Sequence, residues 1–459
     1  MPVQLPRLPR RPLPAPMAGP TTGWRSGLGG LALAVSLALP GLASAQDLKS
    51  LYEAARQYDA TYLAAKANAD SAQYRAAQAL ALQRPSAAVT AGASGDRLDP
   101  PRFSADTSAS AQAQLSGRYP LFNRANAVTV EQSQRTLVSA QAELEAAEQE
   151  LILRVAQAYF DVLAAQDTLT TTRADKTAIT EQLASARRNF EVGTATITDT
   201  REAQARFDLA TFRELAAEND LRTKRIALDQ LVGRSEVAPR PLLVPVVLPT
   251  PQPANPEEWV TAADQQHPTI RRARVGLEVA QLETEKARAA ELPTVDAVAS
   301  VGASDLRNSR LQPNGSTTRA SIGVQLSWPL YTGGATQNRI KETLALEARS
   351  RNELEAARRA VAQGTRVAYF GVLSGSSQVS ALEAAEASSK LALEATQLGY
   401  RVGVRVNLDV LNAQTQLFQT QRDLARARYD VLIGFLRLRQ ASGQLSPADV
   451  ERVNRLLAP

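Results

Sequence analysis

The chain has 459 residues, no cysteine, a single histidine and a formal net charge of +6. The lack of cysteine excludes disulfides, thiolate metal sites and a lipid-acceptor cysteine. His267 has no cluster of other titratable residues around it in the sequence, and there is no glycine-rich phosphate loop. We therefore predict no catalytic site, no metal site and no cofactor.

Residues 1–45 are predicted to be a secretory signal peptide. Four arginines supply positive charge, an apolar run spans 28–39, and Ala43-Ser44-Ala45 provides a small-residue cleavage site. These arginines carry most of the net charge, so the remaining chain gives no reason to expect nucleic-acid binding. The rest of the chain has no apolar run of about 18 residues, and we expect no membrane-spanning helix there.

Residues 46–235 are predicted to form a first structural repeat of a helix, two strands and a long helical hairpin. The helix is expected over 47–84. The second strand alternates small apolar side chains with polar ones up to Tyr119. This alternation is typical of a membrane strand that has lipid on one face and water on the other. One long helix over 123–192 and a returning helix over 199–232 complete the repeat.

The same plan then recurs. Residues 236–256 are a proline-rich linker, 257–445 form a second structural repeat, and 446–459 are a C-terminal tail that we expect to be weakly ordered. The second repeat again opens with one helix, over 256–292. It contains a strand that ends at Trp328-Pro329, because proline cannot donate to a central sheet ladder.

Short sequence matches indicate that the two repeats arose by tandem duplication. The offset between matching residues stays between 209 and 210. The matches are Tyr119-Pro120-Leu121-Phe122 with Trp328-Pro329-Leu330-Tyr331, residues 158–163 with 368–373, and residues 190–193 with 400–403.

Four membrane strands cannot close a barrel, since about eight is the smallest number that does, and lipid does not tolerate an open edge. The chain must therefore share a barrel with other copies, and three copies would give about 12 strands. Tyr119, Trp328 and Tyr331 fall where strands meet long helices, which suits an aromatic girdle at the membrane interface. Ordinary turn aromatics are the alternative interpretation.

These features resemble the TolC family of outer-membrane channel-tunnels, over essentially the whole chain after the signal peptide. The most specific motifs are the two interhelical turns, at 190–199 and 400–410. The resemblance implies a mainly α-helical fold with a membrane β-barrel: a trimeric barrel of about 12 strands on an α-helical periplasmic tunnel. It also implies a homotrimer in outer-membrane lipid that docks through a periplasmic adaptor (membrane fusion) protein onto an inner-membrane ABC or proton-driven transporter.

The resemblance also assigns roles to residues at the two turns. In the family, a tyrosine and an arginine of the second turn hold the closed state by bonding to a threonine and an aspartate of the first. These roles correspond here to a gate latch formed by Tyr400, Arg405, Thr198 and Asp199. Two aspartates of the family form selectivity rings at the aperture; here the positions hold Asp409 and Asn412, and Asn412 departs from the pattern. Helix capping is the alternative role for Asp199 and Asp409.

The function expected from these features is passive export of type I secreted proteins or small toxic compounds. A trimeric adhesin or structural stalk anchored by a barrel is the alternative. In that design the four strands would be contiguous at the C-terminus, whereas here they form two separate hairpins. Nothing in the residues favours an enzyme.

Overall fold

Two successive stretches of the chain fold into the same order of elements. The computed structural model describes residues 46–99, 105–243, 245–309 and 312–458, so the predicted signal peptide lies outside the described residues. The first stretch contains α1 (Leu48–Tyr58), α2 (Ala60–Leu80), the 3-10 turn η1 (Ala81–Gln83), β1 (Ser86–Leu98), β2 (Asp106–Phe122), α3 (Arg124–Glu191) and α4 (Ile197–Val232). The second contains α5 (Pro256–Gln266), α6 (Pro268–Ala289), β3 (Thr294–Arg307), β4 (Gly315–Ser327), α7 (Ala335–Arg401), α8 (Asn407–Ala441) and α9 (Pro447–Asn454).

The first helix of each repeat is divided into two, and the prediction of a single helix was wrong in both. Asp59 ends α1 and caps α2, where its carboxylate accepts a hydrogen bond from the Tyr62 N–H at 2.8 Å. His267 occupies the corresponding position between α5 and α6, 208 residues later. There Pro268 disfavours helical backbone at the residue before it. The duplication therefore includes this break.

The expectation of a weakly ordered tail was also wrong. Residues 447–454 form α9, which starts at a capping box made by Ser446 and Asp449. Val450 and Val453 are buried against the helical core. Leu457 forms a β-bridge with Leu242 of the proline-rich linker, so the end of the chain is held by the linker.

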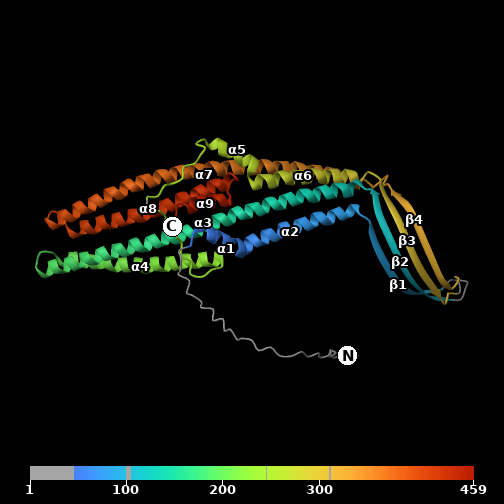
Figure 1. Ribbon diagram of the computed structural model, residues 1–459, viewed down its shortest axis with the longest axis horizontal. Coiled ribbons are helices and arrows are strands. Elements are labelled where there is room, and N and C mark those ends of the chain that lie inside the picture. Colours follow the sequence, from blue (N-terminus) through green and yellow to red (C-terminus); the bar gives the residue numbers. More distant parts are fainter. Residues whose placement is uncertain (1–45, 100–104, 244, 310–311, 459) are drawn as a thin grey trace, which may run out of the picture. The chain divides into compact units, whose positions relative to one another are not determined.

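The four strands form one antiparallel sheet in the order β1-β2-β3-β4 (Figure 1). The strand pairing gathers the alternating residues of every strand onto two faces. One face is apolar or small and includes Val89, Ala91, Ala113, Leu115, Ala299, Val301, Ile322 and Val324. The other is largely polar and includes Thr90, Ser94, Gln112, Gln114, Ser116, Ser300, Ser304 and Ser321.

The apolar face of the sheet is open to the surroundings in the single chain. Ile322 is 89% exposed and Val324 is 67% exposed. Contiguous exposed apolar surface of this kind is uncommon on soluble monomers, and it marks a surface that is covered by lipid or by a partner. None of the described helices is both long and apolar enough to cross a membrane.

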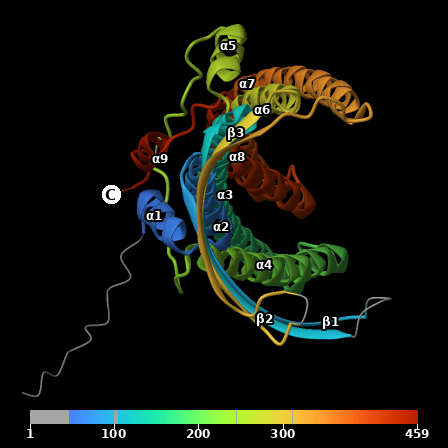
Figure 2. The same ribbon diagram turned by 90° about the vertical axis from the view of Figure 1, so that its right-hand side faces the viewer.

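The long helices are joined into two hairpins that lie side by side. Helix α4 packs on α3, α8 packs on α7, and α8 also contacts α3, so α4 and α7 lie on the two outer sides of this row (Figure 2). The largest buried cluster lies where α1, α9 and the middle of the long helices meet. Phe160 of α3 and Leu436 of α8 are fully buried there, and this apolar packing fixes the two hairpins together midway along their length.

Candidate functional site

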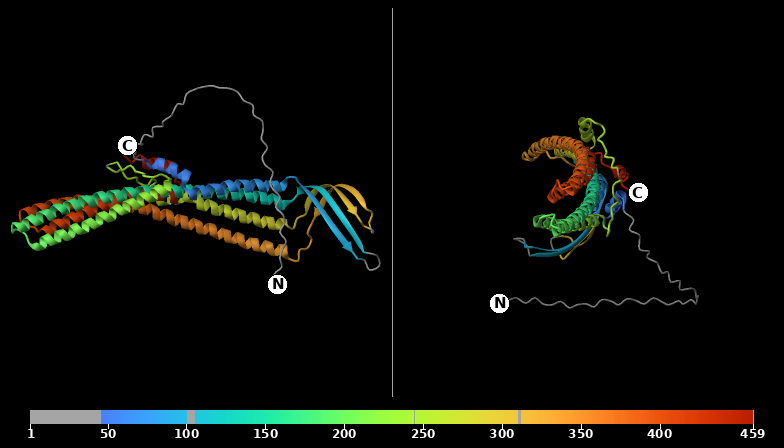
Figure 3. Two further views of the ribbon diagram at one scale, coloured as in Figure 1. Left: turned by 90° about the horizontal axis from the view of Figure 1, so that it is seen from below. Right: turned by 90° about the vertical axis from the view of Figure 1, so that its left-hand side faces the viewer.

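The two interhelical turns lie at the ends of the long helices away from the sheet (Figure 3). Gly193 follows α3 with a φ of +78°, and Gly403 follows α7 with a φ of +81°. Nothing lies within 4 Å of the position that a Cβ would take at either residue. Glycine is therefore favoured here by the left-handed backbone and not by crowding. The two turns have the same backbone geometry because they are duplicates.

Asp199 is held within its own turn. Its carboxylate accepts hydrogen bonds from the Thr196 N–H at 2.9 Å and from the Thr196 hydroxyl at 2.8 Å, while Thr196 Oγ1 accepts from the Asp199 N–H. This reciprocal arrangement is a capping box that starts α4. Thr196 is thus the capping residue, and Asp199 is the third residue of the helix. Thr198 lies beside them with an exposed side chain.

The second turn holds Tyr400, Arg405 and Asp409. Tyr400 accepts a hydrogen bond on its hydroxyl from Asn189 Nδ2 of α3 at 3.0 Å, which links the tips of the two hairpins. Arg405 forms an ion pair with Asp409, with 3.5 Å between Nη1 and Oδ2. Within the described part of the chain, neither Tyr400 nor Arg405 contacts Asp199 through a hydrogen bond or an ion pair. The contacts of the predicted latch therefore remain a prediction.

The aperture residues lie in the first turns of α8. Asp409 is half-buried, and Asn412 is exposed and accepts a hydrogen bond from Arg206 Nη2 of α4 at 3.1 Å. Sequence reasoning missed Asn189 and Arg206. Each is more than 200 residues away from its partner, and no spacing pattern along the chain connects the two.

Between the interhelical turns and the middle of the long helices, α3 contacts α8 through polar residues as well as apolar ones. Tyr429 donates a hydrogen bond to Asp167 at 2.6 Å. Asp175 is 1% exposed, and its Oδ1 has no hydrogen-bond partner among the described residues. Burial raises the pKa of Asp175, although Arg422, Arg213 and Arg206 oppose that shift.

These polar contacts affect how firmly the two hairpins are joined near the tips. Asn407 and Gln414 of α8 are also buried and carry amide oxygens without partners among the described residues. Apolar residues line this part of the seam as well, because Ile179 and Leu183 of α3 share a buried cluster with Leu411 of α8.

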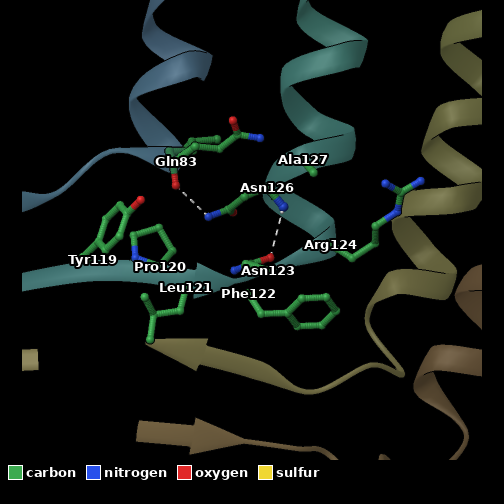
Figure 4. Close-up of a pocket in the computed structure, with 10 residues that line it drawn as sticks. Gln83, Tyr119, Pro120, Leu121, Phe122, Asn123, Arg124, Asn126 and Ala127 are labelled. Carbon is green, nitrogen blue, oxygen red and sulfur yellow. Dashed lines mark hydrogen bonds between the residues drawn. The ribbon is translucent and has the colours of Figure 1, made fainter. Parts of the chain in front are cut away.

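The predicted aromatic girdle lies at the other end of the long helices. Tyr119 borders a hollow of about 390 Å³ between the end of β2 and the start of α3 (Figure 4). Asn123 caps α3 there by accepting a hydrogen bond from the Asn126 N–H at 3.0 Å. Trp328 donates from Nε1 to the Glu291 carbonyl at 3.1 Å, and Tyr331 is 90% exposed. All three rings thus lie where strands meet helices, and their contact with lipid remains a prediction.

Comparisons with known proteins agree with this architecture. The model of the family described as outer membrane efflux protein matches residues 51–234 and 259–444. Outer membrane protein TolC of Vibrio cholerae is 34% identical over 429 residues, which is 92% of this chain and 97% of that protein. Alkaline protease secretion protein AprF of Pseudomonas aeruginosa is 34% identical over 66% of this chain and 64% of its own length.

A solved structure shares the fold at lower sequence identity. The outer membrane protein VceC from Vibrio cholerae superposes with a TM-score of 0.73 and 20% identity, over 86% of this chain and 96% of that one. The predicted fold class, outer-membrane localisation and export-channel function are confirmed, and the adhesin alternative finds no support among these relatives. The chain belongs to the outer membrane efflux protein family, as a member of its TolC-type channels.

Proposed function

We propose that three copies of this chain form one passive channel that carries type I secreted proteins, small toxic compounds or both out of the cell. The observation that carries the proposal is the four-stranded sheet, which has an open edge at β1 and at β4 and one exposed apolar face. A membrane sheet needs closed edges, so neighbouring copies must supply the missing strands. The chain itself performs no catalysis.

The duplication supplies a template for the contact between copies. Within one chain, the first repeat meets the second where β2 pairs with β3 and where α3 contacts α6 and α8. The duplicates of β2 and α3 are β4 and α7. The duplicates of β3, α6 and α8 are β1, α2 and α4. We therefore expect β4 and α7 of one copy to meet β1, α2 and α4 of the next, with the same geometry.

Exposed apolar residues support this arrangement. Phe160 of α3 packs against Tyr429 of α8, with ring centroids 5.6 Å apart, and shares its cluster with Leu436. Its duplicate 210 residues later is Phe370 of α7, which is 56% exposed. The residue 210 positions before Leu436 is Ile226 of α4, which is 52% exposed. The template brings Phe370 and Ile226 of neighbouring copies together and covers both.

The gate and its selectivity follow from the same assembly. In a trimer, Arg405 and Tyr400 of one copy would reach Thr198 and Asp199 of the same or the next copy, which would hold the tips together as a latch. The ion pair between Arg405 and Asp409 would have to open for this contact, because it engages the same guanidinium. Three copies of Asp409 around the aperture would favour cations.

The partners are a periplasmic adaptor protein and an inner-membrane ABC or proton-driven transporter. A passive channel has no energy source of its own, so a transporter must drive the substrate. The name of AprF refers to protease secretion, which supports a secreted protein as one class of cargo.

A deletion strain tests the proposed function and separates the two cargo classes. We expect the strain to lose at least one secreted protein from the medium, or to become sensitive to dyes and detergents, with recovery when the gene is restored. The two effects are scored in parallel by gel analysis of the medium and by growth inhibition. A strain that keeps both its full set of secreted proteins and its resistance would contradict the proposal.

A further inference from the structure

Among the charged residues of the described strands, two have neither an ion pair nor a side-chain hydrogen bond with another strand or loop, and they lie one on each edge strand. Most of the other charged residues of the strands form ion pairs. These pairs are Arg97 with Asp99, Arg118 with Asp296, and Asp305 with Arg307, with N–O distances of 3.5, 2.6 and 2.7 Å. Asp106 accepts a hydrogen bond from Ser309 at 2.8 Å. In the described strands, Asp96 of β1 and Arg319 of β4 remain without an ion pair.

Asp96 and Arg319 are exposed on the same face of the sheet. Asp96 lies opposite Ser108 of β2, and Arg319 lies opposite Gly302 of β3, which in turn lies opposite Gln114 of β2. These positions belong to the polar face. Among the residues that the structure describes, Asp96 accepts a hydrogen bond only from the nearby Ser94 hydroxyl, at 3.1 Å. The two edges that must close the barrel therefore carry opposite charges on the water-facing side.

The duplication predicts how these two edges meet. In the chain, Gln112 of β2 lies opposite Ser304 of β3, and Ser110 lies opposite Leu306. Each residue of β2 has its duplicate in β4 209 positions later, which is the offset that aligns Tyr119 with Trp328. Each residue of β3 has its duplicate in β1 208 positions earlier, which is the offset between the first residues of the two strands.

Applied to the contact between copies, the same register specifies which residues of β4 and β1 lie opposite each other. Ser321 lies opposite Asp96 of the next copy, and Arg319 is the diagonal neighbour of that aspartate on the same face. Diagonal neighbours in antiparallel sheets are about 7–8 Å apart at the backbone, within reach of a long side chain. The arginine on one edge and the aspartate on the other are thus brought together.

We propose that β4 pairs with β1 of a second copy in this register, and that Arg319 and Asp96 form an ion pair across the seam inside the barrel. A shift by one residue would turn the edge strand's polar side chains toward lipid, and a shift by two that moves Arg319 away from Asp96 would separate the charges. A shift by two in the other direction would place Arg319 directly opposite Asp96, and cysteine pairs distinguish that register from the proposed one. The inference rests on the proposed trimer but goes further, since it specifies the register of the β4–β1 contact and an ion pair across it.

Disulfide trapping tests the register, because the chain contains no cysteine of its own. The same register places Gly323 opposite Ser94 of the next copy. Nothing lies within 4 Å of a Cβ at Gly323, so a cysteine fits there. Purified Gly323→Cys with Ser94→Cys should give covalent trimers on a non-reducing gel after oxidation, and monomers after reduction.

Gly323→Cys with Gly92→Cys is the matched control, since it moves one thiol by two residues on the same face. Equal or greater crosslinking of this control would overturn the proposed register. If both variants are trimeric by light scattering but the Ser94 variant does not crosslink, the register is wrong while the trimer stands. If the parent protein is a monomer, the proposed function itself fails.

Charge reversal tests the ion pair in the same protein. Arg319→Asp and Asp96→Arg should each lower the temperature at which the trimer dissociates in detergent, and the double variant should recover most of the loss. A double variant that shows the sum of the two losses would contradict the pair, because independent sites are additive. Arg307→Asp with Asp305→Arg, within one strand, gives the comparison for a pair that does not cross the seam.

Discussion

Phe370→Asp is expected to convert the protein from a trimer into folded monomers. The ring is half-exposed in one chain, and the duplication places it against α4 of the next copy, as Phe160 is placed against α8. Removing a buried phenylalanine costs about 3–5 kcal/mol, and a buried unpaired carboxylate adds to that cost. The loss occurs at three equivalent contacts, so the effect on assembly should be large.

Light scattering with the detergent contribution subtracted measures this change, and circular dichroism checks that the helices persist. Ile226→Asp should have the same effect from the other side of the contact. Val247→Asp is the control, because Val247 is 72% exposed on the proline-rich linker and has no buried duplicate in this template. A Phe370→Asp protein that is as trimeric as the parent would show that this side of α7 does not face a neighbour.

Arg405→Ser combined with Tyr400→Phe is expected to open the resting channel. An exposed charged contact contributes up to about 1 kcal/mol, so three copies bias the equilibrium by about 3 kcal/mol, or roughly 100-fold. The change also removes the ionic partner of Asp409 and the hydroxyl that accepts from Asn189. Resting conductance in planar bilayers should rise, and large antibiotics should leak into cells that carry the variant.

Two further variants separate the latch from helix capping. Asp199→Ala should also raise conductance and add little to Arg405→Ser, since both remove one shared bond. Thr196→Ala removes the capping hydroxyl and leaves the Asp199 carboxylate, so it should lower stability by about 1 kcal/mol without opening the channel. Opening by Thr196→Ala to the same extent would instead favour capping as the role of Asp199.

The same planar-bilayer recordings test the proposed ring of three Asp409 carboxylates, through the ion selectivity of the channel. Arg405→Ser should increase cation selectivity because it leaves the carboxylates unpaired, and Asp409→Lys should shift selectivity toward anions. Unchanged selectivity in both variants would place Asp409 away from the pore.

The sequence predicts most of the fold because its signals repeat. Strict alternation in β2 and β4, a proline at the end of each alternating run (Pro120 within β2 and Pro329 after β4), and the matching turns at Gly193 and Gly403 all occur twice, so each occurrence supports the other. The break at Asp59 was missed because a single capping residue inside an alanine-rich helix leaves helical periodicity unchanged. Helix α9 was missed because eight residues carry too short a pattern.

The candidate site was less predictable, since its contacts join residues far apart in the chain. The bond from Asn189 of α3 to Tyr400 of α7 and the bond from Arg206 of α4 to Asn412 of α8 depend on how the two hairpins pack, which no local pattern specifies. The burial of Asp175 was also not predicted. Asp175 lies on the buried face of α3, whose other residues are mainly small and apolar, and a charged side chain is not expected there.

Single-channel recording of the purified, unmodified protein in planar lipid bilayers tests the central claim most directly. A trimer that shares one barrel and one helical tunnel should give uniform conductance steps, low at rest because the tips are held together, and selective for cations because of Asp409. Folded protein that inserts into the bilayer without conductance steps, or gives steps of several unrelated sizes, would contradict a single shared channel.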